Sequence, residues 1–219
     1  TFADGADIIT ASAGTSNFRA GVNAGNSIAS GGNYNTVVGD EAGTAITTGV
    51  RNVLLGYAAG DSLTDADYNV AVGYDSLAID TLGSKAVALG YAALSTQNFT
   101  SATDNFNTAV GFAAGSSVST GINNTLIGGL AGDALTDADS NVAIGYNSMS
   151  SSVLGSQSVA VGSGALFSMN PASAVNMLNT AVGYDAGNAI TTGTDNTIVG
   201  GLAGDASTTG AGNTFIGKE

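Results

Sequence analysis

The 219-residue chain contains no cysteine and no histidine. Without cysteine it can have neither a disulfide scaffold nor a thiolate metal site. The absence of histidine removes the commonest general base and the commonest transition-metal ligand. Serine is plentiful, but there is no histidine to activate it as a nucleophile. We therefore expect no enzyme, no catalytic residue and no cofactor.

Basic residues are scarce, so the net charge is −13, and the four present are Arg19, Arg51, Lys85 and Lys218. Such a charge repels phosphate backbones and anionic lipid, which argues against nucleic-acid and membrane-surface binding. There is no run of 18 apolar residues, so we expect no membrane insertion by this segment. Because the chain opens on Thr1 rather than methionine, we expect a processed chain or a fragment.

A five-residue motif, typified by Asn69-Val70-Ala71-Val72-Gly73, occurs eleven times. Successive copies lie 17 residues apart, except for two steps of 21, so a super-repeat of 72 residues lies above the short one. Fixed periods of this size indicate a solenoid. The motifs end at Gly39, Gly56, Gly73, Gly90, Gly111, Gly128, Gly145, Gly162, Gly183, Gly200 and Gly217.

The motif predicts a strand, because it is short, rich in β-branched residues and bounded by glycine and polar turn residues. Its third and fourth positions are apolar in every copy and point to opposite faces of a strand. A strand that is apolar on both faces is buried on both, so we expect a partner, most simply further copies of the chain. Which face lies inside the coil is left open.

Each coil is expected to hold a second, more polar strand or turn, as in residues 44–49. Glycine at position five marks a corner where a Cβ would clash or φ is positive. Asparagine at position one suits either an amide ladder between coils or simply the turn conformation. Residues 1–34 form a leading segment with one degenerate coil at residues 17–21, and residues 35–219 form the repeat domain. The fold class is all-β, a parallel β-solenoid of about 11–12 coils.

The pattern Asn-(Val/Thr)-Ala-Val-Gly-Tyr-x-(Ala/Ser) resembles the YadA-like head repeats of trimeric autotransporter adhesins and similar repeats in bacteriophage tail fibres. The resemblance covers residues 35–217 and implies a left-handed β-roll, with three rolls side by side about a threefold axis. Adhesin heads commonly use coils shorter than 17 residues, so the coil shape here differs. The resemblance implies that position four lines the roll or trimer core: Val38, Leu55, Val72, Leu89, Val110, Ile127, Ile144, Val161, Val182, Val199 and Ile216.

Two groups of residues are weaker candidates for binding. Recurrent carboxylates on turns could hold Ca²⁺, but the calcium-roll nonapeptide is missing, and we favour solvated acidic turns at Asp61, Asp65, Asp67, Asp133, Asp137 and Asp139. An aromatic column follows the motif glycine. It could form a sugar-stacking platform, but a stack that fixes strand register is the favoured interpretation. Its members are Tyr57, Tyr74, Tyr91, Phe112, Tyr146 and Tyr184.

The two 21-residue coils carry their extra length at residues 95–106 and 167–178. Loops that leave a regular scaffold often carry binding surfaces. We expect their apolar residues to contact either a receptor or, slightly preferred, a neighbouring chain: Phe99, Phe106, Phe167, Met169 and Met177.

The sequence thus predicts an extracellular, non-enzymatic fibre module, the shaft or head of a trimeric surface adhesin or a phage tail fibre. Its partners would be copies of itself and a host-surface receptor or glycan. Two alternatives stay open. One is a subunit that polymerises end to end into an extracellular filament. The other is a monomeric solenoid that binds ice through threonine rows, although pairs such as Thr47-Thr48 recur only every fourth coil.

Overall fold

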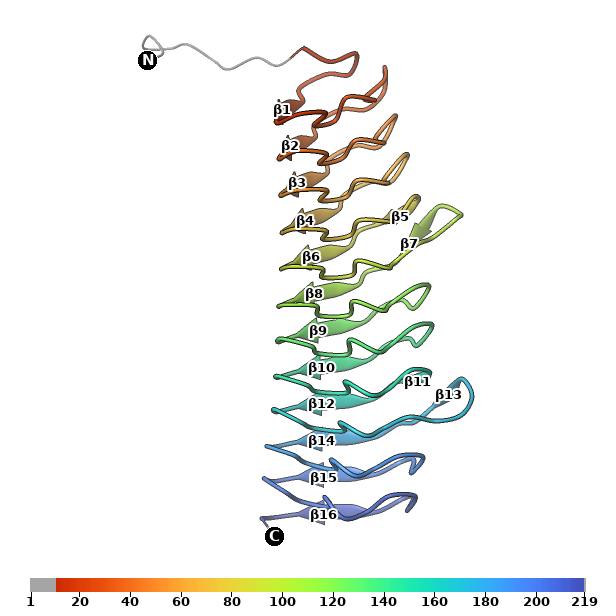
Figure 1. The fold of residues 1–219 in the computed structure, drawn as a ribbon. Coiled ribbons are helices and arrows are strands. Elements are labelled where there is room, and N and C mark those ends of the chain that lie inside the picture. The colour runs from red at the N-terminus through yellow and green to blue at the C-terminus, as the bar shows by residue number, and fades with distance from the viewer. Residues whose placement is uncertain (1–10, 219) are drawn as a thin grey trace, which may run out of the picture.

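In the computed structural model, which describes residues 11–218, the chain is a parallel β-solenoid with one strand per coil (Figure 1). The expected fold class is confirmed. The strands of the main sheet lie in the order β1 (Phe18–Ala20), β2 (Thr36–Val38), β3 (Val53–Leu55), β4 (Val70–Val72), β6 (Val87–Leu89), β8 (Thr108–Val110), β9 (Thr125–Ile127), β10 (Val142–Ile144), β12 (Val159–Val161), β14 (Thr180–Val182), β15 (Thr197–Val199) and β16 (Thr214–Ile216).

Every pair of neighbouring strands in this sheet is parallel and in register. Ala71, for example, lies opposite Leu54 in the preceding coil and Ala88 in the next. The sequence period therefore becomes a spatial column, in which each residue meets its own equivalent one strand spacing away. Twelve strands at about 4.8 Å give a rod about 50 Å long.

Position three of the motif, rather than position four, fills the inside of the coil. Val37, Leu54 and Ala71 are fully buried, as are their equivalents down to Ile198. The position-four residues that we expected in the core point outward, and they are half-buried or exposed in the single chain. Val182, Val199 and Ile216, for example, are all exposed. Of the two places expected for position four, the roll interior is therefore excluded, and a trimer core stays a prediction.

The interior is thin, and residue size is matched across it. Where position three is large, as at Leu54, the residue six places later is Gly60, whose Cβ would lie 2.8 Å from a Leu54 methyl. Where position three is Ala71, the same place holds Leu77. Leu77 fills the space although its φ is +52°, a backbone conformation that costs a side-chain-bearing residue about 1 kcal/mol or more. The small side chain of Ala71 at position three therefore leaves the space that Leu77 fills.

Asparagine at position one forms a ladder through the interior, but the bonds differ from those expected. The backbone N–H of Asn52 donates to Oδ1 of Asn35 at 2.9 Å, and that of Asn69 donates to Oδ1 of Asn52 at 2.9 Å. The Nδ2 group of Asn52 donates to the carbonyl of Ala66 at 2.8 Å and closes its own coil. The asparagine side chain thus accepts a hydrogen bond from the next coil and donates one within its own coil. Direct amide-to-amide bonds occur as well, as between Asn196 and Asn179.

The motif glycines form the corner that the sequence indicates. At Gly73 φ is +137°, and a Cβ would lie 2.4 Å from the carbonyl oxygen of Gly90 in the next coil. No side chain fits at that distance, because the backbones of successive coils already touch.

The second half of the coil is mostly turns, so of the strand or turn expected there, the turn is found in most coils. Backbone bonds still join the coils there, such as Thr47 N–H to the Thr64 carbonyl at 2.9 Å. Within the described residues, short strands occur in that half only where a long coil stacks on the coil before it, as the pairs β5 (Gly83–Ser84) with β7 (Thr103–Asp104) and β11 (Gly155–Ser156) with β13 (Val175–Asn176). Within residues 11–218 no helix is long and apolar enough to cross a membrane.

Candidate functional site

The outward face of the main sheet is a continuous uncharged surface. It is built from position four, which is apolar in every motif, and from position two, which is threonine in six of the eleven motifs and valine in the other five, for example Val53 with Leu55 and Thr108 with Val110. Each column runs the length of the rod, so an apolar side chain is partly covered by its equivalents in the coils on either side. None of the residues on this face between Phe18 and Ile216 is charged, although the chain carries 17 acidic residues. We call this surface the outward face.

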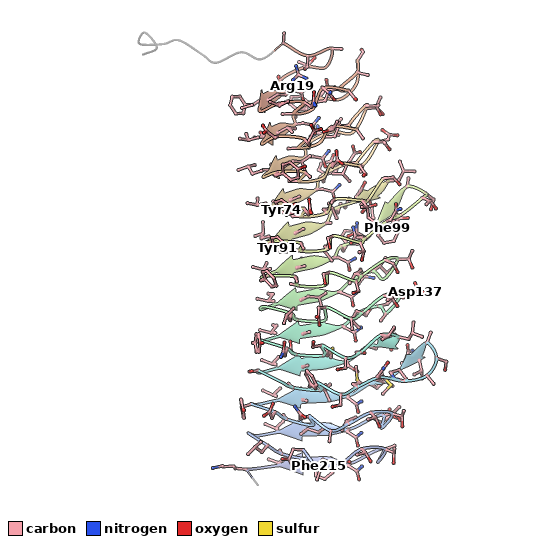
Figure 2. All side chains as sticks on the ribbon, in the orientation of Figure 1. Arg19, Tyr74, Tyr91, Phe99, Asp137 and Phe215 are labelled. Carbon is pink, nitrogen blue, oxygen red and sulfur yellow. The ribbon has the colours of Figure 1, made fainter. Side chains whose placement is uncertain are left out.

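A stack of aromatic rings borders the outward face after the motif glycines. Ring centroids are 5.1 Å apart for Tyr57 and Tyr74, 5.3 Å for Tyr74 and Tyr91, and 5.0 Å for Tyr91 and Phe112. Figure 2 shows Tyr74 and Tyr91 one above the other at this side of the rod. A sugar would need an uncovered ring face for stacking, but in this stack each ring covers the face of its neighbour. The geometry therefore supports the interpretation that these four rings fix the register of the strands.

A second column borders the outward face on the other side, directly before the motif asparagine. The guanidinium of Arg51 lies between two tyrosine rings, 5.3 Å from the centroid of Tyr34 and 5.3 Å from that of Tyr68. Further along, the Lys85 ammonium lies 5.2 Å from the Phe106 centroid and pairs with Asp104. We had not recognised this column in the sequence. Its signal is the run of Tyr, Arg, Tyr, Lys and Phe at one repeat position.

The long coils do not present the apolar surface that we expected. Met169 and Met177 are fully buried, and Phe99 is 6% exposed. These three side chains fold back into the interior of their own coil, and Figure 2 shows Phe99 on the side of the rod away from Tyr74. As partner contacts they were wrongly predicted, because the extra residues widen the coil and the widened interior must be filled. Phe106 is exposed and Phe167 is half-buried, so these two remain on the surface.

A polar network joins the first long coil to the coil before it and is centred on the fully buried Asp80 of that preceding coil. Its carboxylate accepts the backbone N–H groups of Gly83 and Phe99, both at 3.0 Å, and Nε2 of Gln97 at 2.6 Å. Burial raises the pKa of Asp80, and these N–H donors oppose the shift. The residues that correspond to Asp80 and Gln97, 72 positions later, are Ser152 in the coil before the second long coil and Met169 in the long coil itself. The same site is therefore built once from polar and once from largely apolar residues.

The acidic turn residues bond to neighbouring coils rather than to a shared point. Asp65 and Asp137 accept threonine hydroxyls of the preceding coil, and Asp67 accepts the Val50 N–H at 2.7 Å. Asp139 accepts the equivalent Ile122 N–H at 2.8 Å, and Asp133 accepts the hydroxyl of Ser150. Burial is the main cause of a raised pKa at Asp61. The described residues include no group of three or more acidic side chains placed to hold a metal ion.

Comparison of the chain with protein-family models, curated proteins and solved structures finds no match. The functional interpretation therefore rests on the geometry of the chain itself. Its main surface features are the outward face and the two ring-bearing columns that border it.

Proposed function

We propose that the chain is a non-enzymatic structural module of an extracellular fibre, such as the shaft or head of a surface adhesin or a phage tail fibre. Three left-handed rolls would associate side by side, and the stiff rod would hold or form a surface that contacts a host receptor or glycan. The module would act mechanically. Backbone hydrogen bonds join successive coils along the whole rod, so the rod resists bending, and most of its backbone is held too firmly for a protease to cleave.

The observation that carries the proposal is the uncharged outward face. Soluble monomers rarely expose long contiguous apolar surfaces, and those that do commonly use them for association. This face runs the length of a rod about 50 Å long, and acidic groups such as Asp40 and Asp75 lie beyond its edges. Covering it with copies of the same chain would bury Val, Leu and Ile columns that a single chain leaves half in water.

Light scattering at several concentrations gives the first test. For a chain of 21.2 kDa we expect three times that mass, independent of concentration. A monomer at every concentration would overturn the proposal and would favour the open alternative of a solenoid that binds a regular surface. A mass that grows with concentration would favour the filament instead.

A pair of variants then assigns the face. Leu55→Asp places a charge on the outward face at the centre of the first half of the rod, and we expect it to dissociate the assembly while the β-sheet circular dichroism is kept. Ser101→Asp, in an exposed loop of the first long coil, is the matched control and should leave the mass unchanged. An unchanged mass for Leu55→Asp would show that the outward face is not the interface.

A further inference from the structure

The second super-repeat lacks two rings of the aromatic stack, because Gly129 and Ser163 stand where the first has Tyr57 and Tyr91. Shifting by 72 residues carries Tyr74, Tyr91 and Phe112 onto Tyr146, Ser163 and Tyr184. In the first super-repeat the middle ring lies between its neighbours, 5.3 Å and 5.0 Å away. In the second, the flanking rings are present and the middle ring is replaced by a hydroxymethyl group. The two tyrosines that remain are two coil spacings apart, about 9.6 Å along the rod.

A pocket of about 310 Å³ occupies this place, with Tyr146, Ser163, Phe167 and Tyr184 among its lining residues. The rings of Tyr146 and Tyr184 are 58% and 62% exposed, more than the 47% and 50% of Tyr74 and Tyr91 inside the intact stack. A flat group placed in the pocket would therefore lie between two tyrosines, as Tyr91 does between its two neighbours.

Other residues around the pocket have changed together with the ring. Ala92 and Ala113 of the first super-repeat correspond to Gly164 and Asp185. A Cβ on Gly164 would lie 1.9 Å from Oδ1 of Asp185, so the carboxylate occupies room that only glycine leaves. The Asp185 side chain is steadied by Nδ2 of Asn188, which donates to Oδ1 at 3.2 Å.

The one charged group among the residues that line the pocket is the Asp185 carboxylate, whose two oxygens are hydrogen-bond acceptors. The Asp185 carboxylate also raises the pKa of the Tyr184 phenol, through a hydrogen bond and its charge. An occupant that is flat, rich in N–H donors and positively charged would satisfy both the acceptors and the ring faces.

The chain contains an example of such an occupant. At the other border of the outward face, the Arg51 guanidinium lies between Tyr34 and Tyr68, also two coils apart, at 5.3 Å from each ring. Its Nη1 also donates to the Tyr68 hydroxyl at 3.0 Å. We propose that the pocket between Tyr146 and Tyr184 binds the guanidinium of an arginine side chain supplied by another polypeptide, with Asp185 as its counter-ion. A neutral sugar could donate hydroxyl hydrogen bonds to that carboxylate but would leave its charge without a counter-ion. The proposal does not depend on the fibre function.

The test is a titration of the full chain, carrying ¹³C-labelled tyrosine, with N-acetyl-arginine amide followed by NMR. We expect the ring signals of Tyr146 and Tyr184 to shift with a dissociation constant in the millimolar range, because two exposed cation–π contacts are individually weak. N-acetyl-citrulline amide has the same shape without the charge and should bind at least about tenfold more weakly. Free arginine tests whether the peptide groups matter, and methyl glucoside tests the sugar alternative. Binding of the sugar or the citrulline compound as tight as that of arginine would overturn the proposal, as would no shift with arginine.

Three variants locate the site. Ser163→Tyr restores the missing ring and should abolish binding, and Asp185→Ala, the residue of the first super-repeat, should weaken it about tenfold or more while leaving the stack geometry intact. Tyr91→Ser combined with Asp75→Asn is the matched control, since it opens an equivalent slot between Tyr74 and Phe112 and leaves no carboxylate at the positions equivalent to Asn147 and Asp185. No comparable arginine site should appear there. Arginine binding that persists unchanged in both Ser163→Tyr and Asp185→Ala would show that the pocket is not the site. The Asp185→Ala chain keeps the test valid if Ser163→Tyr fails to fold.

Discussion

Oδ1 of Asn105 accepts the backbone N–H of Asn107 at 2.9 Å, and in doing so it replaces a missing member of the asparagine ladder. In most coils this N–H bonds to the asparagine of the preceding coil, but the preceding residue here is Ala86, which has no side-chain oxygen. In the second super-repeat a different side chain supplies the acceptor for this backbone N–H. Ser158 supplies the oxygen for the N–H of Asn179 at 3.2 Å, and the residue equivalent to Asn105 is the apolar Met177.

Asn105→Met should therefore destabilise the chain, because it leaves the buried N–H of Asn107 without an acceptor. A cost of about 1–3 kcal/mol is expected for such a group. Ala86→Ser should recover much of this loss in the double variant while having little effect alone, as measured by chemical unfolding in a double-mutant cycle. Strictly additive effects of the two changes would contradict the idea that the two residues substitute for each other.

Asp80 should make stability depend on pH in a defined direction. Burial raises its pKa in the folded chain above the ordinary 3.8, so the folded state holds the proton more tightly than the unfolded state. Asp80 therefore favours folding most at pH values below 3.8, and that contribution is lost as pH rises through the raised pKa.

The reference for this measurement is Asp80→Ser with Gln97→Met, which introduces the residues found 72 positions later at Ser152 and Met169. We expect the wild-type chain to lose unfolding free energy relative to this variant as pH rises across that window, in urea titrations at matched ionic strength. The comparison cancels the other carboxylates. A wild-type chain that gains stability relative to the variant over the same window would show that the N–H donors outweigh the burial.

Gly128 and Gly129 are adjacent but should respond oppositely to alanine. Gly128 has φ of +133°, and a Cβ there would lie 2.6 Å from the carbonyl oxygen of Gly145. We expect Gly128→Ala to cost about 2–6 kcal/mol through backbone strain and overpacking. At Gly129 a Cβ would meet only the Tyr146 ring at 3.6 Å, so Gly129→Ala should change stability by less than about 0.5 kcal/mol. Thermal unfolding of the two variants makes the comparison, and equal losses would contradict it.

Much of the rod could be predicted from the sequence, because the repeat converts directly into spatial columns. The motif determined one strand per coil, and its glycine determined a corner at which backbones touch, as Gly73 and Gly90 do. The degenerate copy at residues 17–21 was likewise readable, and β1 pairs in register with β2. These features depend on local conformation and on the period, both of which are written in the chain.

Tertiary structure alone decided which apolar position faces inward. Both Ala71 and Val72 are apolar, so the strand sequence alone does not show which of them is a core residue. The space available inside the coil decides it, and Ala71 is the one that is buried. At these two levels that space is set by the residue six places later, Gly60 beside Leu54 and Leu77 beside Ala71. At Ala109 the residue six places later is Gly115, and the side chains of Leu94 and Leu126 from the neighbouring coils approach that glycine instead. Close packing also explains why Phe99, Met169 and Met177 are buried. A coil that is four residues longer encloses more space, and these side chains fill it.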